Sequence, residues 1–168
     1  CSLTDLLKKG ELPLRVTHND TKINNVLFDP ETKDPLTVID LDTVMPGLVG
    51  YDFGDAVRFS ANTTAEDEKD IRKVSLDLEQ VKSFAEGFLS CLKGDLTPNE
   101  VSTLALGSFC ITIELAARFL DDYLTGDKYF KTCYEGHNLV RTKAQLALAK
   151  DMEKKLDDMQ EIVYRSME

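Results

Sequence analysis

Apolar and polar positions divide the chain into a short extended part followed by a long helical part. The runs NVLF (25–28) and LTVIDL (36–41) are apolar and β-branched, and the turn-forming stretch DPETKDP lies between them. This pattern predicts a small β-hairpin, because strand-forming runs on either side of a turn pair with each other. From about residue 52 onward, apolar residues recur at helical spacing instead. The sequence therefore predicts an α+β fold that is predominantly helical.

The helical part carries recognisable start and stop signals. Apolar spacing predicts a helix over residues 78–92 that ends near Gly94. The stretch TPNE (97–100) is a capping box with proline at the first helical position, and it predicts a long helix toward Gly126. A last helix is expected over residues 138–163.

The region before residue 78 is more irregular. We expect a short helix in SLTDLLKKG (2–10) and another in YDFGDAVRFSAN (51–62). Residues 43–51 contain Pro46, Gly47 and Gly50, so they are expected to form a loop.

Length and composition restrict the partners. The 168 residues fit a single domain. The formal net charge of -10 argues against nucleic acid and anionic membrane surfaces, because both would repel this chain. With no apolar run long enough to span a bilayer, we expect a soluble protein, with the cytoplasm as the default location.

Cysteine and histidine give little sign of metal or redox chemistry. The four cysteines are far apart and form no C-x-x-C pair, so we expect reduced, buried thiols rather than a zinc or redox site. His137 has no second ligand at metal spacing and is expected to be structural or exposed. No cysteine begins a C-x-P-x-R pattern, so formylglycine-dependent sulfate ester hydrolysis is unsupported.

The stretch HNDTKINN concentrates the polar chemistry of the chain. His18, Asp20 and Asn25 fit the spacing H-x-D-x-x-x-x-N, which is the catalytic loop of protein-kinase-like phosphotransferases. The spacing suits phosphoryl transfer, because a carboxylate must orient an attacking hydroxyl while an amide oxygen nearby binds magnesium. Taken singly, these residues could instead be turn residues that bond their own backbone.

A second magnesium ligand is expected at the end of the predicted hairpin. Asp40 closes the apolar strand LTVID, and the hairpin would return it to the same cleft as Asp20. A carboxylate is the oxygen ligand that Mg²⁺ favours. The literal DFG at 52–54 is rejected as the metal site, because Asp52 lies at a helix start, where an aspartate satisfies free amides.

Three motifs, HNDTKINN, VIDLDTV and YDFGDAVR, resemble the aminoglycoside phosphotransferase and choline kinase superfamily. The likeness is greatest to the N-acetylhexosamine 1-kinase branch and is strongest over residues 16–62. It implies a protein-kinase-like carboxy-terminal lobe that uses ATP and Mg²⁺.

The resemblance also implies a role for each site residue. Asp20 would be the catalytic base, with Lys22 beside the transferred phosphate, and Asn25 and Asp40 would bind magnesium. Two further residues, His18 and Asp52, would support the loop. Three roles are open for Asp42: it could contact the ligands of the metal ion, contact the sugar, or face solvent.

The same resemblance predicts how the domain is organised. Such kinases hold ATP between two lobes, yet few residues precede HNDTKINN and no glycine-rich strand-turn-strand is present. We therefore expect residues 1–168 to form the carboxy-terminal lobe alone, with the loop and hairpin at about 16–42 and the helical body at about 52–166. Without the amino-terminal ATP-binding lobe, this fragment is expected to be inactive and to expose a face that could self-associate.

The expected reaction is transfer of the γ-phosphate of ATP to a sugar hydroxyl. The anomeric hydroxyl of an N-acetylhexosamine is favoured, and choline, ethanolamine, homoserine, other sugars and aminoglycosides are alternative acceptors. A non-catalytic kinase-like binding module is the other alternative. Four aromatic residues could stack on a sugar, although core packing is the more common use of such residues: Tyr123, Tyr129, Phe130 and Tyr134.

Overall fold

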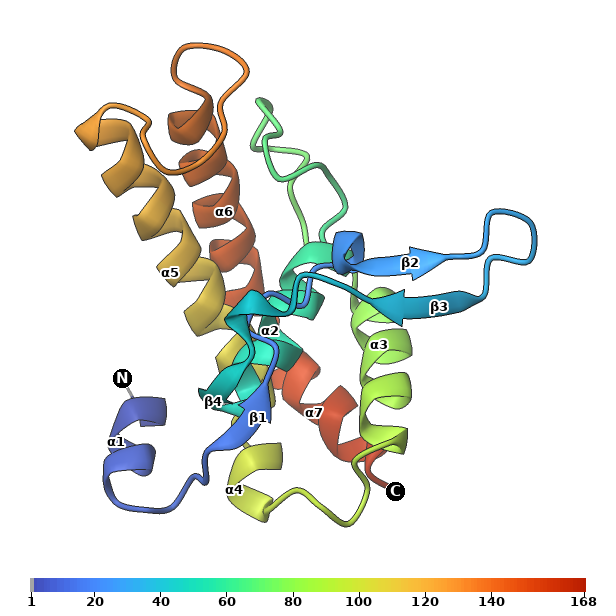
Figure 1. Cartoon of the computed structure of the whole chain (residues 1–168). Helices are drawn as coiled ribbons and strands as arrows, with labels where there is room; N and C mark the ends of the chain where they lie inside the picture. The colour runs from blue at the N-terminus through green and yellow to red at the C-terminus, as the bar shows by residue number, and fades with distance from the viewer. Residues whose placement is uncertain (1) are drawn as a thin grey trace.

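The computed structural model describes residues 2–168 and shows a helical body from which one β-hairpin projects (Figure 1). The predominantly helical α+β composition confirms the expected fold class. The elements follow in the order α1 (Ser2–Lys8), β1 (Arg15–Thr17), β2 (Val26–Phe28), β3 (Pro35–Val38), β4 (Met45–Gly47), α2 (Val49–Ser60), α3 (Leu78–Ser90), α4 (Pro98–Val101), α5 (Leu104–Thr125), α6 (His137–Lys154) and α7 (Leu156–Ser166), with short 3-10 helices at Ile23–Asn25 and Leu41–Thr43.

The strands form two separate antiparallel pairs. The predicted hairpin is confirmed, because β2 pairs with β3 in the register Val26↔Val38 and Leu27↔Thr37. The loop expected over residues 43–51 is wrong, since β4 pairs with β1 and α2 already begins at Val49. Pro46 is tolerated in β4 because a two-stranded sheet has an unpaired side, where a missing N–H costs nothing.

The core lies between α2 and the helices around it. Phe53 and Val57 of α2 are fully buried, and the Phe53 ring centroid lies 5.5 Å from Phe84 and 5.4 Å from Phe88, both on α3. On its other side α2 packs against α5, which also packs lengthwise against α6 (Figure 1). The helix predicted over 51–62 is thus confirmed, with its apolar face at the centre of the body.

Two of the long helices predicted from the sequence are each broken once. The capping box at Thr97 is confirmed, but α4 ends at Val101 and α5 begins at Leu104. At this break Thr103 Oγ1 donates to the carbonyls of Asn99 and Glu100 at 2.8 and 2.9 Å, and such bonds compete with the helix backbone. The predicted end of this helix near Gly126 is confirmed, and the glycine adopts left-handed geometry with φ 96°.

The second break separates α6 from α7 at Lys155. The single helix expected over 138–163 is wrong there, because Lys155 leaves helical geometry with φ -104° and ψ 9°. Its Nζ donates to Leu76 O and to Asp151 Oδ2, both at 2.7 Å. These bonds tie the break to the segment before α3.

A partly buried ion pair ties the strands to the helical body. Arg15 of β1 donates from Nε and from a terminal guanidinium nitrogen to the two carboxylate oxygens of Glu100, both at 2.8 Å. The Glu100 side chain is 2% exposed, whereas that of Arg15 is 36% exposed. Glu100 also accepts the N–H of Thr97 at 2.8 Å, so one carboxylate caps α4 and fixes β1.

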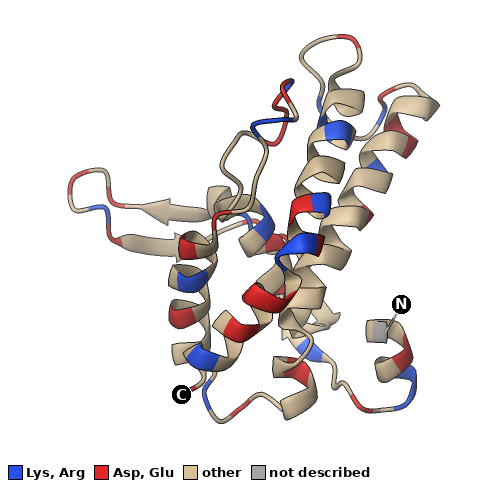
Figure 2. Ribbon diagram, turned by 180° about the vertical axis from the view of Figure 1, so that it is seen from behind, with Lys and Arg blue, Asp and Glu red and all other residues tan. Residues whose placement is uncertain are grey.

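Surface features bear on the expected partners and cysteines. Acidic and basic residues alternate along α3 and much of the helical surface (Figure 2). Among the described residues, no helix is long and apolar enough to cross a membrane.

The expectation of buried thiols is wrong for Cys91 and Cys133, which are exposed because they lie at a helix end and in a loop. Cys110 is half-buried, and Cys1 lies outside the described residues.

Candidate active site

The segment from His18 to Asn25, called here the His18–Asn25 loop, is held against α2 by one carboxylate. The N–H of His18 donates to Asp52 Oδ2 and the N–H of Asn19 donates to Asp52 Oδ1, both at 2.8 Å. Thr21 Oγ1 donates to Asp52 O at 2.6 Å. Asp52 therefore holds the backbone of this loop, although it belongs to the first turn of a different element.

Asp20 lies at the centre of the loop, and both of its carboxylate oxygens have partners. Lys22 Nζ lies 2.8 Å from Oδ1, and Asn25 Nδ2 donates to Oδ2 at 3.0 Å. Burial raises the pKa of Asp20, but the hydrogen bonds and charge of Lys22, with smaller effects of Asn25 and His18, lower it below the usual range. The group is therefore an ionised acceptor near neutral pH.

Asn25 and Asp40 present oxygen atoms that the described residues leave without hydrogen bonds. Asn25 uses its Nδ2 on Asp20, which leaves Oδ1 directed elsewhere. Asp40 is exposed and stands in the left-handed region with φ 62°, two residues beyond β3. The N–H of Ile39 donates to Asn25 O at 2.9 Å, so the two segments are adjacent. An amide oxygen and a carboxylate with unused acceptor capacity suit a hard cation such as Mg²⁺.

The remaining residues proposed from the sequence have different surroundings. His18 is partly buried, and its Nε2 lies 3.1 Å from Ile39 O, which links the loop to the end of the hairpin. Asp42 is exposed within the 3-10 helix Leu41–Thr43. Among residues 2–168, no group of three or more histidine, cysteine or acidic side chains is arranged to bind a metal ion.

The DFG letters at residues 52–54 lie inside α2 and have structural surroundings. Asp52 binds loop amides, Phe53 is fully buried, and Gly54 faces α5. A Cβ atom at Gly54 would lie 2.7 Å from Ser108 Cα, so α2 and α5 approach each other closely at this glycine.

A cavity of about 280 Å³ opens beside Asp20 and joins the loop to the helical body. Its wall includes Arg58 of α2, Arg118 of α5, and Tyr129 and Phe130 from the segment after α5. Arg58 is the last residue of the YDFGDAVR motif, and Tyr129 and Phe130 are two of the four aromatic residues that could stack on a sugar, whereas Arg118 belongs to no motif found in the sequence. Asn25 and Asp40, the two residues expected to bind a metal ion, do not line this cavity.

The two arginines of the cavity are held differently. Arg58 is 1% exposed and donates to Asp55 Oδ1 at 2.8 Å and to Glu66 Oε1 at 2.8 Å. Arg118 forms no ion pair with any residue from 2 to 168; its guanidinium instead lies 5.6 Å from the ring centroid of Tyr129. The charge of Arg58 is therefore neutralised within the protein, while Arg118 remains a cation stacked on an aromatic ring.

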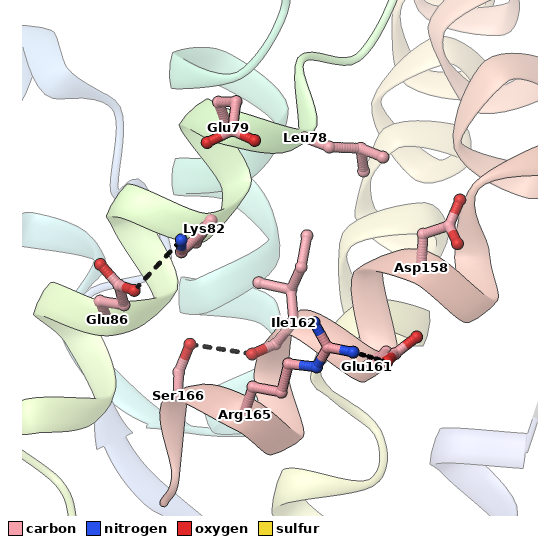
Figure 3. A pocket seen from close by; sticks show the side chains of 9 residues that line it. All are labelled: Leu78, Glu79, Lys82, Glu86, Asp158, Glu161, Ile162, Arg165 and Ser166. Carbon is pink, nitrogen blue, oxygen red and sulfur yellow. Dashed lines mark hydrogen bonds and ion pairs between the residues drawn. The ribbon is translucent and has the colours of Figure 1, made fainter.

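A different cleft, of about 480 Å³, lies between α3 and α7 (Figure 3). Its two basic side chains pair within their own helices, Lys82 with Glu86 and Arg165 with Glu161. These are the exposed pairs one turn apart that are common on helix surfaces. Although larger, this cleft contains none of the residues that the sequence indicates for chemistry.

The amino-terminal half of the chain is similar to a known protein family. Residues 2–84 match the model of APH, a phosphotransferase enzyme family. This segment is just under half of the chain, and it contains the His18–Asn25 loop, the β-hairpin and α2. The match supports a place in the aminoglycoside phosphotransferase and choline kinase superfamily and a kinase-type activity. Arg118, which the sequence did not indicate, and the aromatic candidates Tyr129 and Phe130 lie outside the matched residues.

Proposed function

We propose that the protein is an ATP-dependent phosphotransferase that acts on a sugar hydroxyl bound in the cavity beside Asp20. The observation that carries this proposal is the position of Asp20, which lines a cavity together with the aromatic Tyr129 and with Arg118, an arginine that forms no ion pair with residues 2–168. The match to a phosphotransferase family supports the reaction class.

The charges around the cavity favour a neutral acceptor. The chain has a net charge of -10, yet the cavity is lined by three acidic side chains, Asp20, Asp55 and Glu114, and by three basic ones, Lys22, Arg58 and Arg118. A cationic acceptor such as choline or an aminoglycoside would gain little from a balanced wall that includes an unpaired arginine. A sugar suits it better, because hydroxyl groups can bond both signs and an aromatic face can cover the ring.

Asp20 would orient the acceptor hydroxyl for attack on the γ-phosphorus of ATP. The new bond joins the acceptor oxygen to phosphorus, the bond from phosphorus to the bridging oxygen of ADP breaks, and the hydroxyl proton passes to the Asp20 carboxylate. A lowered pKa makes Asp20 a weak base, which is sufficient because a loose transition state needs little early deprotonation.

Magnesium and nucleotide would bind on the hairpin side of Asp20. Asn25 Oδ1 and the Asp40 carboxylate would hold the ion, which offsets negative charge on the phosphates. Lys22, paired with Asp20 at 2.8 Å, would place its charge beside the transferred group. In the strand region as a whole, the side chains of Val16, Leu36 and Leu41 are 81%, 63% and 60% exposed, and a nucleotide or an amino-terminal lobe would cover such apolar side chains.

Within the sugar class, we propose the anomeric hydroxyl of an N-acetylhexosamine as the acceptor and the cytoplasm as the location. The resemblance to the 1-kinase branch supports this choice. We propose further that residues 1–168 need an amino-terminal lobe for activity. Comparing ADP release by this chain with that of the full-length gene product tests the last point.

The acceptor is tested by ADP release with Mg-ATP and one of N-acetylglucosamine, N-acetylgalactosamine, choline, homoserine or an aminoglycoside. We expect release with an N-acetylhexosamine. Release with choline, homoserine or an aminoglycoside alone would contradict the sugar assignment while leaving the phosphotransferase class intact. No release with any acceptor by folded full-length protein that binds ATP would contradict the class, and it would favour the kinase-like binding module.

A further inference from the structure

The wall of the Asp20 cavity contains a loop that is fixed by a single carboxylate. Asp122, in the last turn of α5, is 5% exposed. Its Oδ1 accepts the N–H groups of Lys128 and Tyr129, each at 2.8 Å, and its Oδ2 accepts the N–H of Phe130 at 2.9 Å. Three consecutive backbone amides are therefore held by one side chain.

The carboxylate also connects this loop to α6. Asn138, fully buried in the first turn of α6, donates from Nδ2 to Asp122 Oδ2 at 2.9 Å and to Asp127 Oδ1 at 2.8 Å. The turn itself uses two left-handed residues, Gly126 with φ 96° and Asp127 with φ 53°. A non-glycine residue in that region persists where its surroundings impose it, and here they do.

The fixed loop carries the aromatic side chains of the cavity wall. Phe130 packs on Phe119 with ring centroids 4.6 Å apart, while Tyr129 is 74% exposed at the rim. Both rings lie near the Arg118 guanidinium, which is 5.6 and 5.5 Å from their centroids. Tyr129, Phe130, Arg118 and Glu114 also line a neighbouring cavity of about 570 Å³, so the loop shapes two adjoining hollows.

An exposed tyrosine needs no such arrangement for stability. A buried carboxylate with four hydrogen bonds has a large desolvation cost, and packing alone would be achieved more simply by apolar residues. The arrangement instead gives one definite position to Tyr129, which faces the acceptor side of Asp20.

We propose that Asp122 is a positioning residue for acceptor binding, because it fixes the Lys128–Phe130 loop as the aromatic wall of the acceptor site. This inference rests on the proposed phosphotransferase function. It predicts that changes at Asp122 affect the acceptor and leave the nucleotide unaffected, since the nucleotide would bind beside Asn25 and Asp40.

The test is steady-state kinetics of Asp122→Asn in the full-length protein, with N-acetylglucosamine and Mg-ATP as the varied substrates. The substitution replaces one acceptor oxygen by an N–H₂ group and so loses up to two of the four hydrogen bonds. We expect the KM for the sugar to rise roughly tenfold or more, because small misplacements of binding groups have effects of this size. The KM for ATP should be unchanged.

The matched control is Asp121→Asn, which makes the same change of charge one residue earlier on α5. Asp121 is exposed, and its carboxylate accepts no hydrogen bond from residues 2–168. This variant should keep the KM for both substrates. Hydrogen exchange supplies a second readout, in which the amides of Lys128, Tyr129 and Phe130 should exchange faster in Asp122→Asn and at the wild-type rate in Asp121→Asn.

Should Asp122→Asn fail to fold, Tyr129→Ala removes the wall while leaving the hydrogen bonds of Asp122 in place, and it should raise the KM for the sugar alone. An unchanged sugar KM in either folded variant would overturn the inference, as would an equal rise for ATP in Asp122→Asn. Failure of the proposed function has a different signature, namely wild-type protein that transfers phosphate to none of the acceptors.

Discussion

The hairpin region (residues 15–47) and the helical body (residues 49–166) hold their polar side chains in opposite ways. In the hairpin region Asp20, Asn25 and Asp40 are half-buried or exposed, and they bond one another or remain without partners. In the body Arg58 and Glu100 are almost fully buried and saturated with bonds. Unused bonding capacity near the surface suits ligand binding, whereas saturated buried groups fix geometry. The body therefore fixes positions, and the hairpin region is where we propose that the chemistry takes place.

The change expected to have the largest effect is Asp20→Asn, which should separate activity from stability. Loss of the acceptor for the hydroxyl proton should lower kcat by about 10²–10⁴-fold. Kinetics with a sugar acceptor and a thermal melt check this. Asp34→Asn, an exposed carboxylate at the hairpin turn, is the control and should keep full activity. Retention of more than a tenth of kcat in Asp20→Asn would contradict a role of this residue in the reaction.

A change at Glu100, in contrast to one at Asp20, should lower the free energy of unfolding. Glu100→Gln removes a buried carboxylate that binds Arg15 and caps α4, so we expect a loss of about 2 kcal/mol in the free energy of unfolding. Urea denaturation measures it. A loss below about 0.5 kcal/mol, the size typical of surface substitutions, would show that the pair does not couple β1 to the body.

The same residue predicts a dependence of stability on pH. Burial raises the pKa of Glu100, but the hydrogen bonds from Arg15 and Thr97 outweigh burial, so the pKa lies below its ordinary value. The folded protein therefore binds fewer protons than the unfolded chain. The stabilisation is present above the ordinary pKa, about 4.3, and is lost as pH falls through the lowered value. Glu100→Gln should flatten the acid limb of a stability profile as the pH falls below about 4.3. Parallel profiles for both proteins would refute this assignment.

Two glycines offer a paired test of packing within the body. Gly54→Ala would place Cβ 2.7 Å from backbone atoms of Ser108, so α2 and α5 must separate and about 2 kcal/mol should be lost. Gly87→Ala in α3 meets no atom within 4 Å and should stabilise by about 0.5–1 kcal/mol through helix propensity. Chemical denaturation of both variants compares them directly. Similar effects of the same sign would contradict the close approach of α2 and α5.

The smallest effect is expected at the tip of the hairpin. Lys33 adopts φ 66°, and glycine accepts that geometry without strain but with a greater entropy of the unfolded chain. These terms oppose each other, so Lys33→Gly should change stability by less than about 0.5 kcal/mol and leave kcat unchanged. A marked fall in kcat would show that the hairpin tip takes part in the site.

Local signals explain what could be predicted from the sequence. The hairpin follows from two apolar runs around DPETKDP, and the start of α4 follows from its capping box. The grouping of Asp20, Lys22 and Asn25 follows from spacing within one loop, and the structure brings these three together. Their roles in catalysis stay predictions until activity is measured.

What the sequence did not indicate depends on contacts between distant residues. The pairing of β1 with β4 joins three-residue segments that are 28 or more positions apart, too short for an alternating pattern. The break at Lys155 depends on Leu76, far away in sequence. The cavity wall combines Asp20 with Arg118 and Tyr129, and no local motif marks aromatic residues that face a cavity rather than the core.

The most direct test of the central claim is ³¹P NMR of full-length protein with Mg-ATP and N-acetylglucosamine, beside Asp20→Asn and Asp34→Asn. We predict a sugar phosphate resonance, coupled to the anomeric proton, in the wild type and in Asp34→Asn, with none in Asp20→Asn over the same time. A sugar phosphate formed equally well by folded Asp20→Asn would contradict the claim that Asp20 and its cavity form the acceptor site.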